Sequence, residues 1–405
     1  MTRIALATVG TTGDVAPFAI LAGQLAARGH DVTAVTWPVH RSVLAQAGVR
    51  VEVAGSHADA ARIASVAADA AARGPMDQVA VLRDFHLADG EAHYRRLLEL
   101  LAGHDIVVLH AIHALAHAAV LEIGARWATA VFDPVLLPTA TAPPPGMPNL
   151  GPLNRLTWSM LDRMLARTGK PLDEVLARAR SHQHGLPLFR ARSPMLHMVA
   201  CSPSIIRVPD DLPPSTRVTG AWLDRSTPEP MAPDLEAFLG DGAAPIVIAF
   251  GSMSGSTDDA LGAAIEAMLD AGRRVVVQGN AGRSLTSPNL VHVGRVDHRA
   301  LFPRASLVIH HGGAGTTHAA CAAGVPSVVV PHVGDQRYWA DRLQRLGVAP
   351  KPILARGLDG RALADGALAA AADPTLRAAA ERLAASIGAE NGVASAVAAI
   401  ESAVR

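Results

Sequence analysis

This chain is poor in the features that mark secreted, membrane-spanning or nucleic-acid-binding proteins. It has only two cysteines in 405 residues, Cys201 and Cys321, which excludes a disulfide framework and fits a reducing compartment. Its 36 basic and 36 acidic residues balance, so neither sign is in excess to attract nucleic acid or an anionic membrane. A long uncharged run, residues 106–121, contains three histidines and predicts a buried strand and helix rather than a membrane span.

The first residues are expected to form a strand and not a secretion signal. Their apolar run, residues 4–9, is short and ends in the turn sequence Gly10-Thr11-Thr12-Gly13. We therefore expect a cytoplasmic protein without stable membrane insertion. At 405 residues the chain exceeds the usual length of one domain, and two domains are expected.

Two stretches of the chain repeat the same order of elements. The apolar run 4–9 is followed by a Gly-rich turn, a helical stretch to Leu25 and the apolar run 32–35. The same order recurs from residues 246–250, through a helical stretch to Leu269, to residues 275–277. Short apolar strands that alternate with helices form parallel sheets covered on both faces, so the sequence predicts an α/β protein with two doubly wound units.

Prolines mark the boundary between these halves. A stretch without helical or strand pattern contains Pro209, Pro213, Pro214, Pro228, Pro230 and Pro233. We expect an N-terminal domain over residues 1–215, a stiff linker over 216–233 and a C-terminal domain over 234–390. A second Pro/Gly cluster, residues 138–152, follows the apolar run 129–132. It fits either an acceptor loop at the carboxyl end of a strand or a plain surface loop.

The most informative stretch, residues 310–317, reads HHGGAGTT. It follows the apolar run 307–309 and precedes a run of small residues, so it predicts a strand, a Gly-rich turn and a helix start. Such a turn lets backbone N–H groups approach an anion, and the helix N-terminus adds partial positive charge. The histidine pair beside it adds side-chain donors for a phosphate. Without its neighbours the turn would indicate only a helix packed tightly on a sheet.

A second polar pair, Asp335 and Gln336, follows the next apolar run at residues 327–330. A carboxylate beside an amide can hydrogen-bond to the hydroxyls of a sugar. The aspartate is also a good N-cap for the helix that follows, and the two roles are compatible. A phosphate cradle with a hydroxyl-binding pair after the next strand predicts a nucleotide-sugar site.

This order of motifs resembles the donor-binding signature of family-1 glycosyltransferases, which use UDP-sugar-type donors. It is most similar to bacterial natural-product and sterol-type members, which carry a similar run from HHGGAGT through AGVP to GDQ. The likeness extends more weakly over nearly the whole chain. It implies a GT-B fold, in which two Rossmann-like domains face each other across a cleft, with a last helix, residues 391–405, that crosses back onto the first domain.

The resemblance also implies roles for single residues in donor binding. The diphosphate is expected to be held by Ser252, by His311 and by the backbone of Gly313, Gly315 and Thr316. His310 is expected to be structural, because a histidine beside an apolar strand usually has its hydrogen bonds satisfied there. Asp335 and Gln336 correspond to the sugar-binding pair, which suits a hexose such as glucose.

The nucleotide base is expected beside residues 293–302, where Val296 offers its backbone to the base edge. Arg295 falls near the tryptophan that plant members use for stacking, and its guanidinium can stack on a base or remain solvated. One position departs from the plant pattern: Ala319 stands where those members carry a ribose-binding glutamate. Because sterol-type members lack this glutamate too, the donor stays open between UDP and dTDP.

Two residues of the first half are candidates for catalysis. Asp14 follows the first Gly-rich turn, where similar bacterial members carry Gly-Asp-Val, and it can act as the base that deprotonates the acceptor. Alternatively, it caps a helix that runs from about Pro17 to Ala27. His110 ends the apolar run 106–109, where His-type members carry the aspartate that partners their base. It fits a catalytic partner of Asp14 or a structural histidine.

Two histidine pairs, His113 with His117 and His182 with His184, have spacings that would allow metal binding. No carboxylate or third ligand accompanies either pair convincingly in the sequence, so acceptor-pocket or surface positions are expected. In the resembling family the leaving phosphate is stabilised by histidine and helix dipole, without a required metal.

These observations predict an inverting O-glycosyltransferase that needs no cofactor. Its co-substrate is expected to be a UDP- or dTDP-sugar with a glucose-like hexose, and its acceptor a lipophilic or natural-product hydroxyl compound. Two other functions fit the fold: a UDP-sugar 2-epimerase, which would need further carboxylates, and a sugar- or nucleotide-binding protein without chemistry. Asp14 at the first turn favours an enzyme over a binding protein.

Overall fold

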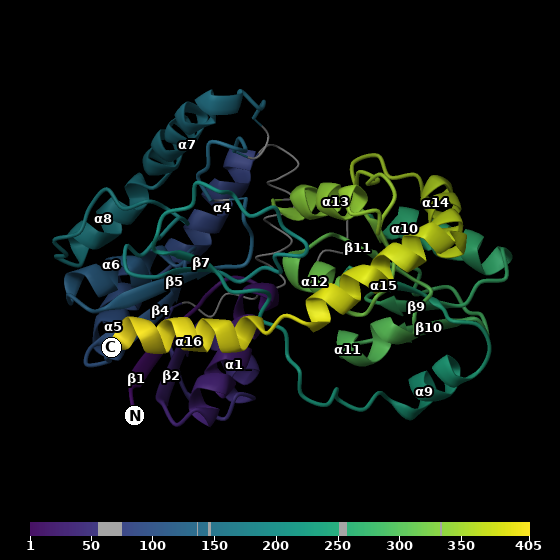
Figure 1. Cartoon of the computed structure of the whole chain (residues 1–405), viewed down its shortest axis with the longest axis horizontal. Helices are drawn as coiled ribbons and strands as arrows, with labels where there is room; N and C mark the ends of the chain where they lie inside the picture. The colour runs from purple at the N-terminus through teal and green to yellow at the C-terminus, as the bar shows by residue number, and fades with distance from the viewer. Residues whose placement is uncertain (56–74, 136, 145–146, 251–256, 333) are drawn as a thin grey trace. The chain divides into compact units, whose positions relative to one another are not determined.

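The computed structural model describes residues 1–55, 75–135, 137–144, 147–250, 257–332 and 334–405. These residues form two compact units (Figure 1): unit 1 comprises Met1–Asp224 and Asn391–Arg405, and unit 2 comprises Arg225–Glu390. Each unit is built on a parallel β-sheet with helices packed on it. The α/β class with two doubly wound units, predicted from the sequence, is confirmed.

The sheet of unit 1 has seven parallel strands in the order β3-β2-β1-β4-β5-β6-β7. They are β1 (Arg3–Ala7), β2 (Asp31–Thr36), β3 (Arg50–Val53), β4 (Ile106–His110), β5 (Trp127–Val131), β6 (His197–Val199) and β7 (Thr216–Val218). The order reverses between β1 and β4, which pair from Ile4 opposite Ile106 to Ala7 opposite Leu109. Open α/β sheets bind ligands beyond the carboxyl ends of the strands at such a point.

Alternate residues of the strands supply two cores in unit 1, one on each face of the sheet. In β1, Ile4 and Leu6 join the core on one face of the sheet, whereas Ala5 and Ala7 join the core on the other. The α-helices are α1 (Thr12–Ala27), α2 (Arg41–Ala45), α4 (Pro75–Leu87), α5 (Gly90–Leu101), α6 (Ala114–Glu122), α7 (Asn154–Thr168), α8 (Lys170–Arg178) and α16 (Gly392–Val404). Two 3-10 helices are η1 (Pro38–His40) and η2 (Gly151–Leu153).

The last helix, α16, packs into unit 1 against α1. Its buried residues in the first core are Val393, Ala396, Val397 and Ile400. Among the described residues, Pro374–Val404 is long and apolar enough to cross a membrane by length and composition alone. In the structure this stretch is two helices, α15 (Pro374–Gly388) and α16, which belong to different units. Packing in the core of unit 1 accounts for the apolar face of α16.

The boundary of unit 1 differs from the expected one. Residues Thr216–Val218, which we assigned to the linker, form β7, and unit 1 continues to Asp224. A three-residue strand is too short to show a period of two between the prolines that surround it. Residues 225–232, ahead of α9 (Pro233–Gly240), form neither helix nor strand.

The sheet of unit 2 has five parallel strands in the order β10-β9-β8-β11-β12. They are β8 (Ile246–Ala249), β9 (Val275–Gln278), β10 (Leu290–Val293), β11 (Leu307–His310) and β12 (Ser327–Val329). This order reverses between β8 and β11, so the loops after these two strands are where a ligand is expected.

Helices also cover the sheet of unit 2. They are α9, α10 (Asp258–Asp270), α11 (His298–Leu301), α12 (Ala314–Ala322), α13 (Gln336–Arg345), α14 (Gly360–Ala372) and α15, with the 3-10 helix η4 (Phe302–Arg304). In β8, Ile246 and Ile248 face one core and Val247 and Ala249 the other. At Gly360 any Cβ would collide with the backbone of α10, so α14 can approach α10 closely only with glycine there.

Candidate functional site

The loop after β11 is shaped by His310 and Gly312. His310 is fully buried, and its Nδ1 accepts a hydrogen bond from the backbone N–H of Gly312 at 3.1 Å. Gly312 has a φ of +87°, and an added Cβ would stand 2.8 Å from Cγ1 of Val329 in β12. Only glycine satisfies both conditions. His310 therefore fixes the turn that leads the chain into α12.

His311 folds back over this turn. Its ring lies so close to Gly313 that any Cβ there would collide with Nε2. The ring centroid is 6.5 Å from that of Phe250, which follows β8. Burial, with a further effect of nearby His332, lowers the pKa of His311 to about 4. At neutral pH the ring is uncharged and can donate one hydrogen bond to an anion.

The N-terminus of α12 presents backbone donors beside His311. Gly313 is the N-cap, and the N–H of Thr317 donates to its carbonyl at 2.9 Å. The N–H groups of Ala314, Gly315 and Thr316 precede that bond and have no acceptor within the helix. A Cβ at Gly315 would meet none of the described atoms within 4 Å. An anion can therefore approach these donors directly.

Asp335 and Gln336 are both hydrogen-bonded within unit 2, at the end of β12. Asp335 is the N-cap of α13 by position, but its Oδ2 accepts from the indole Nε1 of buried Trp339 at 2.7 Å. Gln336 is buried, and its Oε1 accepts from the backbone N–H of His332 at 2.7 Å. His332 also hydrogen-bonds through Nδ1 with the carbonyl of Val330 at 2.8 Å. These bonds hold the pair in a fixed geometry.

Arg295 and Val296 follow β10 at the edge of the sheet. Arg295 is exposed, and Val296 is half-buried against the core. Close by, Nε2 of His298 donates to Oε1 of Gln278, which ends β9, over 2.7 Å. The His298 ring stacks on Phe302, with centroids 4.1 Å apart and planes 16° from parallel. The ends of β9 and β10 thus offer a flat ring and an exposed guanidinium to a planar group.

These three groups lie in strand order along the carboxyl edge of the sheet. Arg295 and Val296 follow β10, residues 311–316 follow β11, and the Asp335–Gln336 pair follows β12. Neighbouring strands are about 4.8 Å apart, which puts roughly 14 Å between the first group and the second and roughly 5 Å between the second and the third. A sugar nucleotide has the same linear order: base, diphosphate, sugar.

Ser252 follows β8, the strand beside β11, but residues 251–256 lie outside the described residues. Its expected contact with the diphosphate therefore stays a prediction. The described chain resumes at Thr257, which is buried, and its hydroxyl lies 3.4 Å from Nε2 of His332.

In unit 1, Asp14 is fixed at the start of α1. Its Oδ2 accepts hydrogen bonds from the backbone N–H and the hydroxyl of Thr11, at 2.7 and 2.8 Å. Gly10 makes room for it, since φ there is +120° and a Cβ would stand 2.5 Å from Oδ2. The Gly10 carbonyl accepts from Nε2 of buried His40 at 2.8 Å. The Asp14 side chain remains 28% exposed.

His110, at the end of β4, meets Asp14 across the point where the strand order reverses. Its Nε2 lies 3.9 Å from Oδ1 of Asp14, and its Nδ1 lies 3.4 Å from the carbonyl oxygen of Val9. A carbonyl can only accept, so Nδ1 carries the proton in that bond and Nε2 presents a lone pair to Asp14. Burial lowers the pKa of His110, which keeps the ring neutral. A hydroxyl group between Nε2 and Oδ1 would find two acceptors for its proton.

The helix after β1 begins earlier than the sequence suggested. It starts at Thr12 and not at about Pro17, because Thr11 is the N-cap. Asp14 occupies the third helical position and bonds back to the N–H of Thr11, which is half of a capping box. Pro17 is tolerated inside the helix, where it removes one intrahelical donor. The capping role of Asp14 is therefore real, and it uses Oδ2 while Oδ1 faces His110.

His113 and His117 are buried in unit 1, whereas His182 and His184 lie at its surface. His113 is the N-cap of α6, and its Nδ1 accepts from the N–H of Ala116 at 3.5 Å. The His117 ring packs on Trp127, and His182 pairs with Glu122 at 2.7 Å, whereas His184 is exposed. Within the described ranges, no group of three or more His, Cys, Asp or Glu side chains could hold a metal ion.

The buried histidines predict a loss of stability in mild acid. Burial lowers the pKa to about 3 or 4 for His86, His93, His117, His197, His298, His310 and His311. Each ring stays neutral in the folded chain down to that pH, but binds a proton in the unfolded chain at about pH 6.5. Between about pH 6.5 and 4 the unfolded state therefore binds more protons, and the melting temperature should fall steeply as the pH falls.

Thermal melts followed by circular dichroism above, within and below this window check the prediction. Replacing buried His93 by Leu should flatten the pH dependence, whereas replacing exposed His184 by Gln should leave it unchanged. A melting temperature that stays constant as the pH falls through the window would contradict it.

Sequence reasoning missed several residues of these sites. His332 lies near His311, and its backbone N–H donates to Gln336. Its position shortly after an apolar run was the signal that could have identified it. Gln278 and His40 had no such signal, because their partners lie 20 and 30 residues away in the chain.

Several known proteins are similar to this chain in sequence. Residues 263–401 match the family described as Erythromycin biosynthesis protein CIII-like, C-terminal domain. The chain is 32% identical to O-mycaminosyltylonolide 6-deoxyallosyltransferase of Streptomyces fradiae, over 98% of this chain and 97% of the relative. It is 31% identical to vancomycin aglycone glucosyltransferase of Amycolatopsis orientalis, over 85% of this chain and 84% of that relative.

A solved structure agrees at the level of the fold. The glycosyltransferase VinC, in complex with dTDP, aligns with a TM-score of 0.69 and 19% identity over 99% of both chains. At this identity the likeness shows the fold alone and says nothing of the ligand.

Proposed function

Because the chain belongs to the family of natural-product glycosyltransferases with the GT-B fold, we propose that it transfers a glucose-like hexose from UDP or dTDP, with inversion, to a hydroxyl of a lipophilic acceptor. The observation that carries this proposal is the order of groups along the edge of unit 2. A base site after β10, an anion site after β11 and a polar pair after β12 follow the order of parts in a sugar nucleotide.

In this proposal the diphosphate lies at the N-terminus of α12. It receives hydrogen bonds from the N–H groups of residues 314–316, from neutral His311 and from Ser252. Gly315 leaves the space for it open, and Gly313 makes room for the His311 ring. The same donors stabilise the negative charge that develops on the diphosphate as it leaves. The helix terminus and the histidine supply this stabilisation without a metal ion.

The base and the sugar lie on either side of the diphosphate. Val296 offers its backbone to the base edge and Arg295 stacks on the base plane, while Asp335 and Gln336 bind the hexose hydroxyls. One relative is named a glucosyltransferase and one solved neighbour holds dTDP. Those names describe the neighbours, and they make UDP-glucose and dTDP-glucose the first donors to test.

Asp14 is the proposed general base. Its Oδ2 is held by Thr11, so Oδ1 is kept in place to take the proton of an acceptor hydroxyl. His110 is a positioning residue that accepts or orients the same hydroxyl through Nε2. Attack from the side of the base, opposite the leaving diphosphate, inverts the anomeric carbon. Cys201 and Cys321 are buried and form no disulfide, which suits the proposed cytoplasmic setting.

Nucleotide release tests the proposal against its rivals. A transferase should release UDP or dTDP from the donor only when an acceptor is supplied. Conversion of the donor sugar without acceptor would instead identify an epimerase, and binding without any conversion would identify a binding protein. Mass spectrometry of a donor and aglycone panel reads all three outcomes.

Substitution of Asp335 tests the sugar site. Asp335→Asn keeps an oxygen that accepts from Trp339, so the fold should hold, but the carboxylate that binds hydroxyls is lost. We expect turnover with the sugar donor to fall by about tenfold or more, the loss of a charge-assisted hydrogen bond, with the affinity for free nucleotide unchanged.

The matched control is Trp339→Phe, which removes the indole donor and leaves the carboxylate. It should lower the melting temperature and spare turnover. If Asp335→Asn merely melts earlier and turns over normally, Asp335 is only a structural partner of Trp339.

A further inference from the structure

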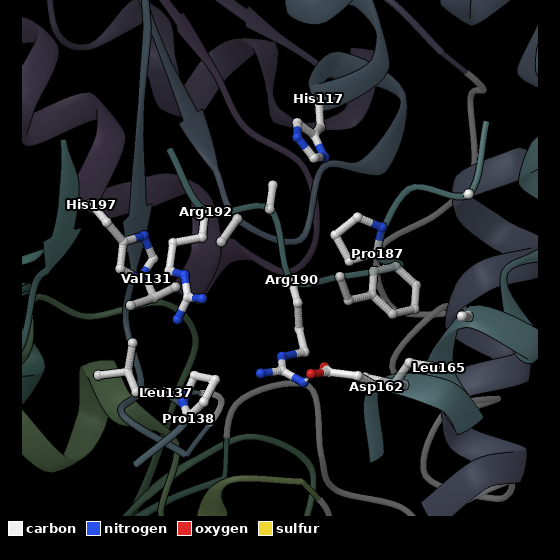
Figure 2. Close-up of a pocket in the computed structure, with 15 residues that line it drawn as sticks. His117, Val131, Leu137, Pro138, Asp162, Leu165, Pro187, Arg190, Arg192 and His197 are labelled. Carbon is white, nitrogen blue, oxygen red and sulfur yellow. Dashed lines mark hydrogen bonds and ion pairs between the residues drawn. The ribbon is translucent and has the colours of Figure 1, made fainter. Parts of the chain in front are cut away.

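Unit 1 holds a cavity of about 390 Å³ whose lining is mostly apolar (Figure 2). Its apolar walls come from the end of β5, from α7 and from the loops beside them, and include Val131, Leu137, Leu165 and Phe189. The volume is in the range of pockets that hold small organic ligands. Ala111, which directly follows His110, also lines it. The cavity is thus one residue away in the chain from the proposed catalytic pair.

Two arginines enter this apolar lining from one short segment. Arg190 and Arg192 flank Ala191, whose N–H donates to the carbonyl of Ala111 at 2.9 Å. Figure 2 shows both side chains extending in the same direction from this segment. The Arg190 side chain is only 7% exposed, and its guanidinium pairs with Asp162 of α7 and lies 5.2 Å from the Trp158 ring centroid. Arg192 is exposed, and its guanidinium forms no hydrogen bond or ion pair with any described residue.

The charges in the lining do not cancel. Asp162 offsets Arg190, which leaves the charge of Arg192. The two histidines of the cavity, His117 and His197, are neutral at pH 7, because burial lowers the pKa of each to about 4. Buried Nδ1 of His117 also has no partner among the described atoms. The lining therefore carries one excess positive charge, on the exposed side chain of Arg192, beside an apolar surface that an organic anion can contact.

We propose that this cavity binds the acceptor and that Arg192 pairs with an acidic group on it, such as a carboxylate. The acceptor is then an apolar compound that carries one anionic group as well as the hydroxyl to be glycosylated. Arg190, held by Asp162 and Trp158, positions the segment and adds a second donor. The identification of the ligand as the acceptor rests on the proposed function. The binding of an apolar anion in this cavity can be tested without any transfer.

A pair of fluorescent probes tests the charge preference without any sugar donor. Anilinonaphthalene sulfonate and phenylnaphthylamine share their aromatic rings and differ in the anionic group. The full-length protein should bind the sulfonate about 2- to 5-fold more tightly than the neutral probe, the range of an ion pair at an exposed side chain. Arg192→Gln should abolish this preference and Arg192→Lys should retain most of it. Arg178→Gln, an exposed change of equal charge on α8 outside the cavity lining, should have no effect.

Equal affinities for the two probes, or a preference that survives Arg192→Gln, would overturn the proposal. A second measurement compares hydroxynaphthoate with its methyl ester as acceptor. The acid should show a lower KM than the ester in the parent protein and lose that advantage in Arg192→Gln. Nucleotide binding and donor turnover, measured separately, report on the proposed function. Charge-selective probe binding without sugar transfer would therefore contradict the proposed transferase activity and support the proposed anion site.

Discussion

Asp14→Asn should lower the turnover number by roughly 10²- to 10⁴-fold, the usual contribution of a general base. The amide keeps an oxygen that accepts from the Thr11 N–H, so α1 and the fold should remain intact. What is lost is a basic oxygen at the position of Oδ1, 3.9 Å from Nε2 of His110. Steady-state kinetics with a sugar nucleotide and an acceptor measure the effect, and calorimetry should find unchanged nucleotide binding.

Thr11→Ala is the matched control, because it removes a partner of Oδ2 and leaves the carboxylate in place. This variant should lose roughly 0.5–2 kcal/mol of stability, as other N-cap substitutions do, and keep most of its turnover. Near-normal turnover in Asp14→Asn, on an acceptor that the parent protein glycosylates, would show that the base is elsewhere. His110→Gln would then be the next variant to measure.

His311→Ala should weaken the binding of UDP or dTDP by about 10- to 150-fold, which corresponds to roughly 1.5–3 kcal/mol for a hydrogen bond to a charged acceptor. The imidazole is uncharged at neutral pH, because burial lowers its pKa to about 4. Its contribution is therefore one N–H donor to the phosphate and not a full positive charge. Isothermal titration calorimetry with the free nucleotides measures this directly.

His311→Asn restores a side-chain N–H and should recover part of the lost affinity. The melting temperature of each variant controls for damage to the turn, since His311 packs over Gly313. Unchanged affinity in a well-folded His311→Ala protein would reject the site at α12 and remove the main support for the donor geometry.

Much of the fold follows from patterns within short stretches of the sequence. The apolar runs of β1, β4, β8 and β11 and the glycines that follow β1, β8 and β11 are contiguous signals, so the α/β class and the turn into α12 could be predicted. The start of α1 was misplaced, because Pro17 looked like a first-turn residue when Thr11 is the cap. The strand β7 was missed because its three residues carry no readable period.

The candidate site was predictable where its residues are close in sequence. His311 and the N-terminus of α12 come from one run, and their geometry follows from the glycines within it. The meeting of Asp14 and His110 could be proposed only through the resemblance, since 96 residues separate them in the chain and their contact depends on the pairing of β1 with β4. The bonds from Trp339 to Asp335 and from His332 to Gln336 needed side-chain positions that no pattern supplies.

Arg190 and Arg192 carried no signal in the sequence. They lie in a segment without regular structure, and their importance comes from the cavity that α7 and the end of β5 build around them. Residues of this kind are found only when the packing of distant elements is known.

The configuration of the product is the sharpest test of an inverting transfer with Asp14 as the base. The protein is incubated with UDP-glucose or dTDP-glucose, whose sugar is α-linked, and with hydroxylated polycyclic acceptors that include carboxylic acids. Nuclear magnetic resonance of the isolated product should show a β-O-glucoside. Its amount should equal that of the nucleoside diphosphate released. An α-linked product, or nucleotide release that does not depend on the acceptor, would contradict an inverting transfer with Asp14 as the base.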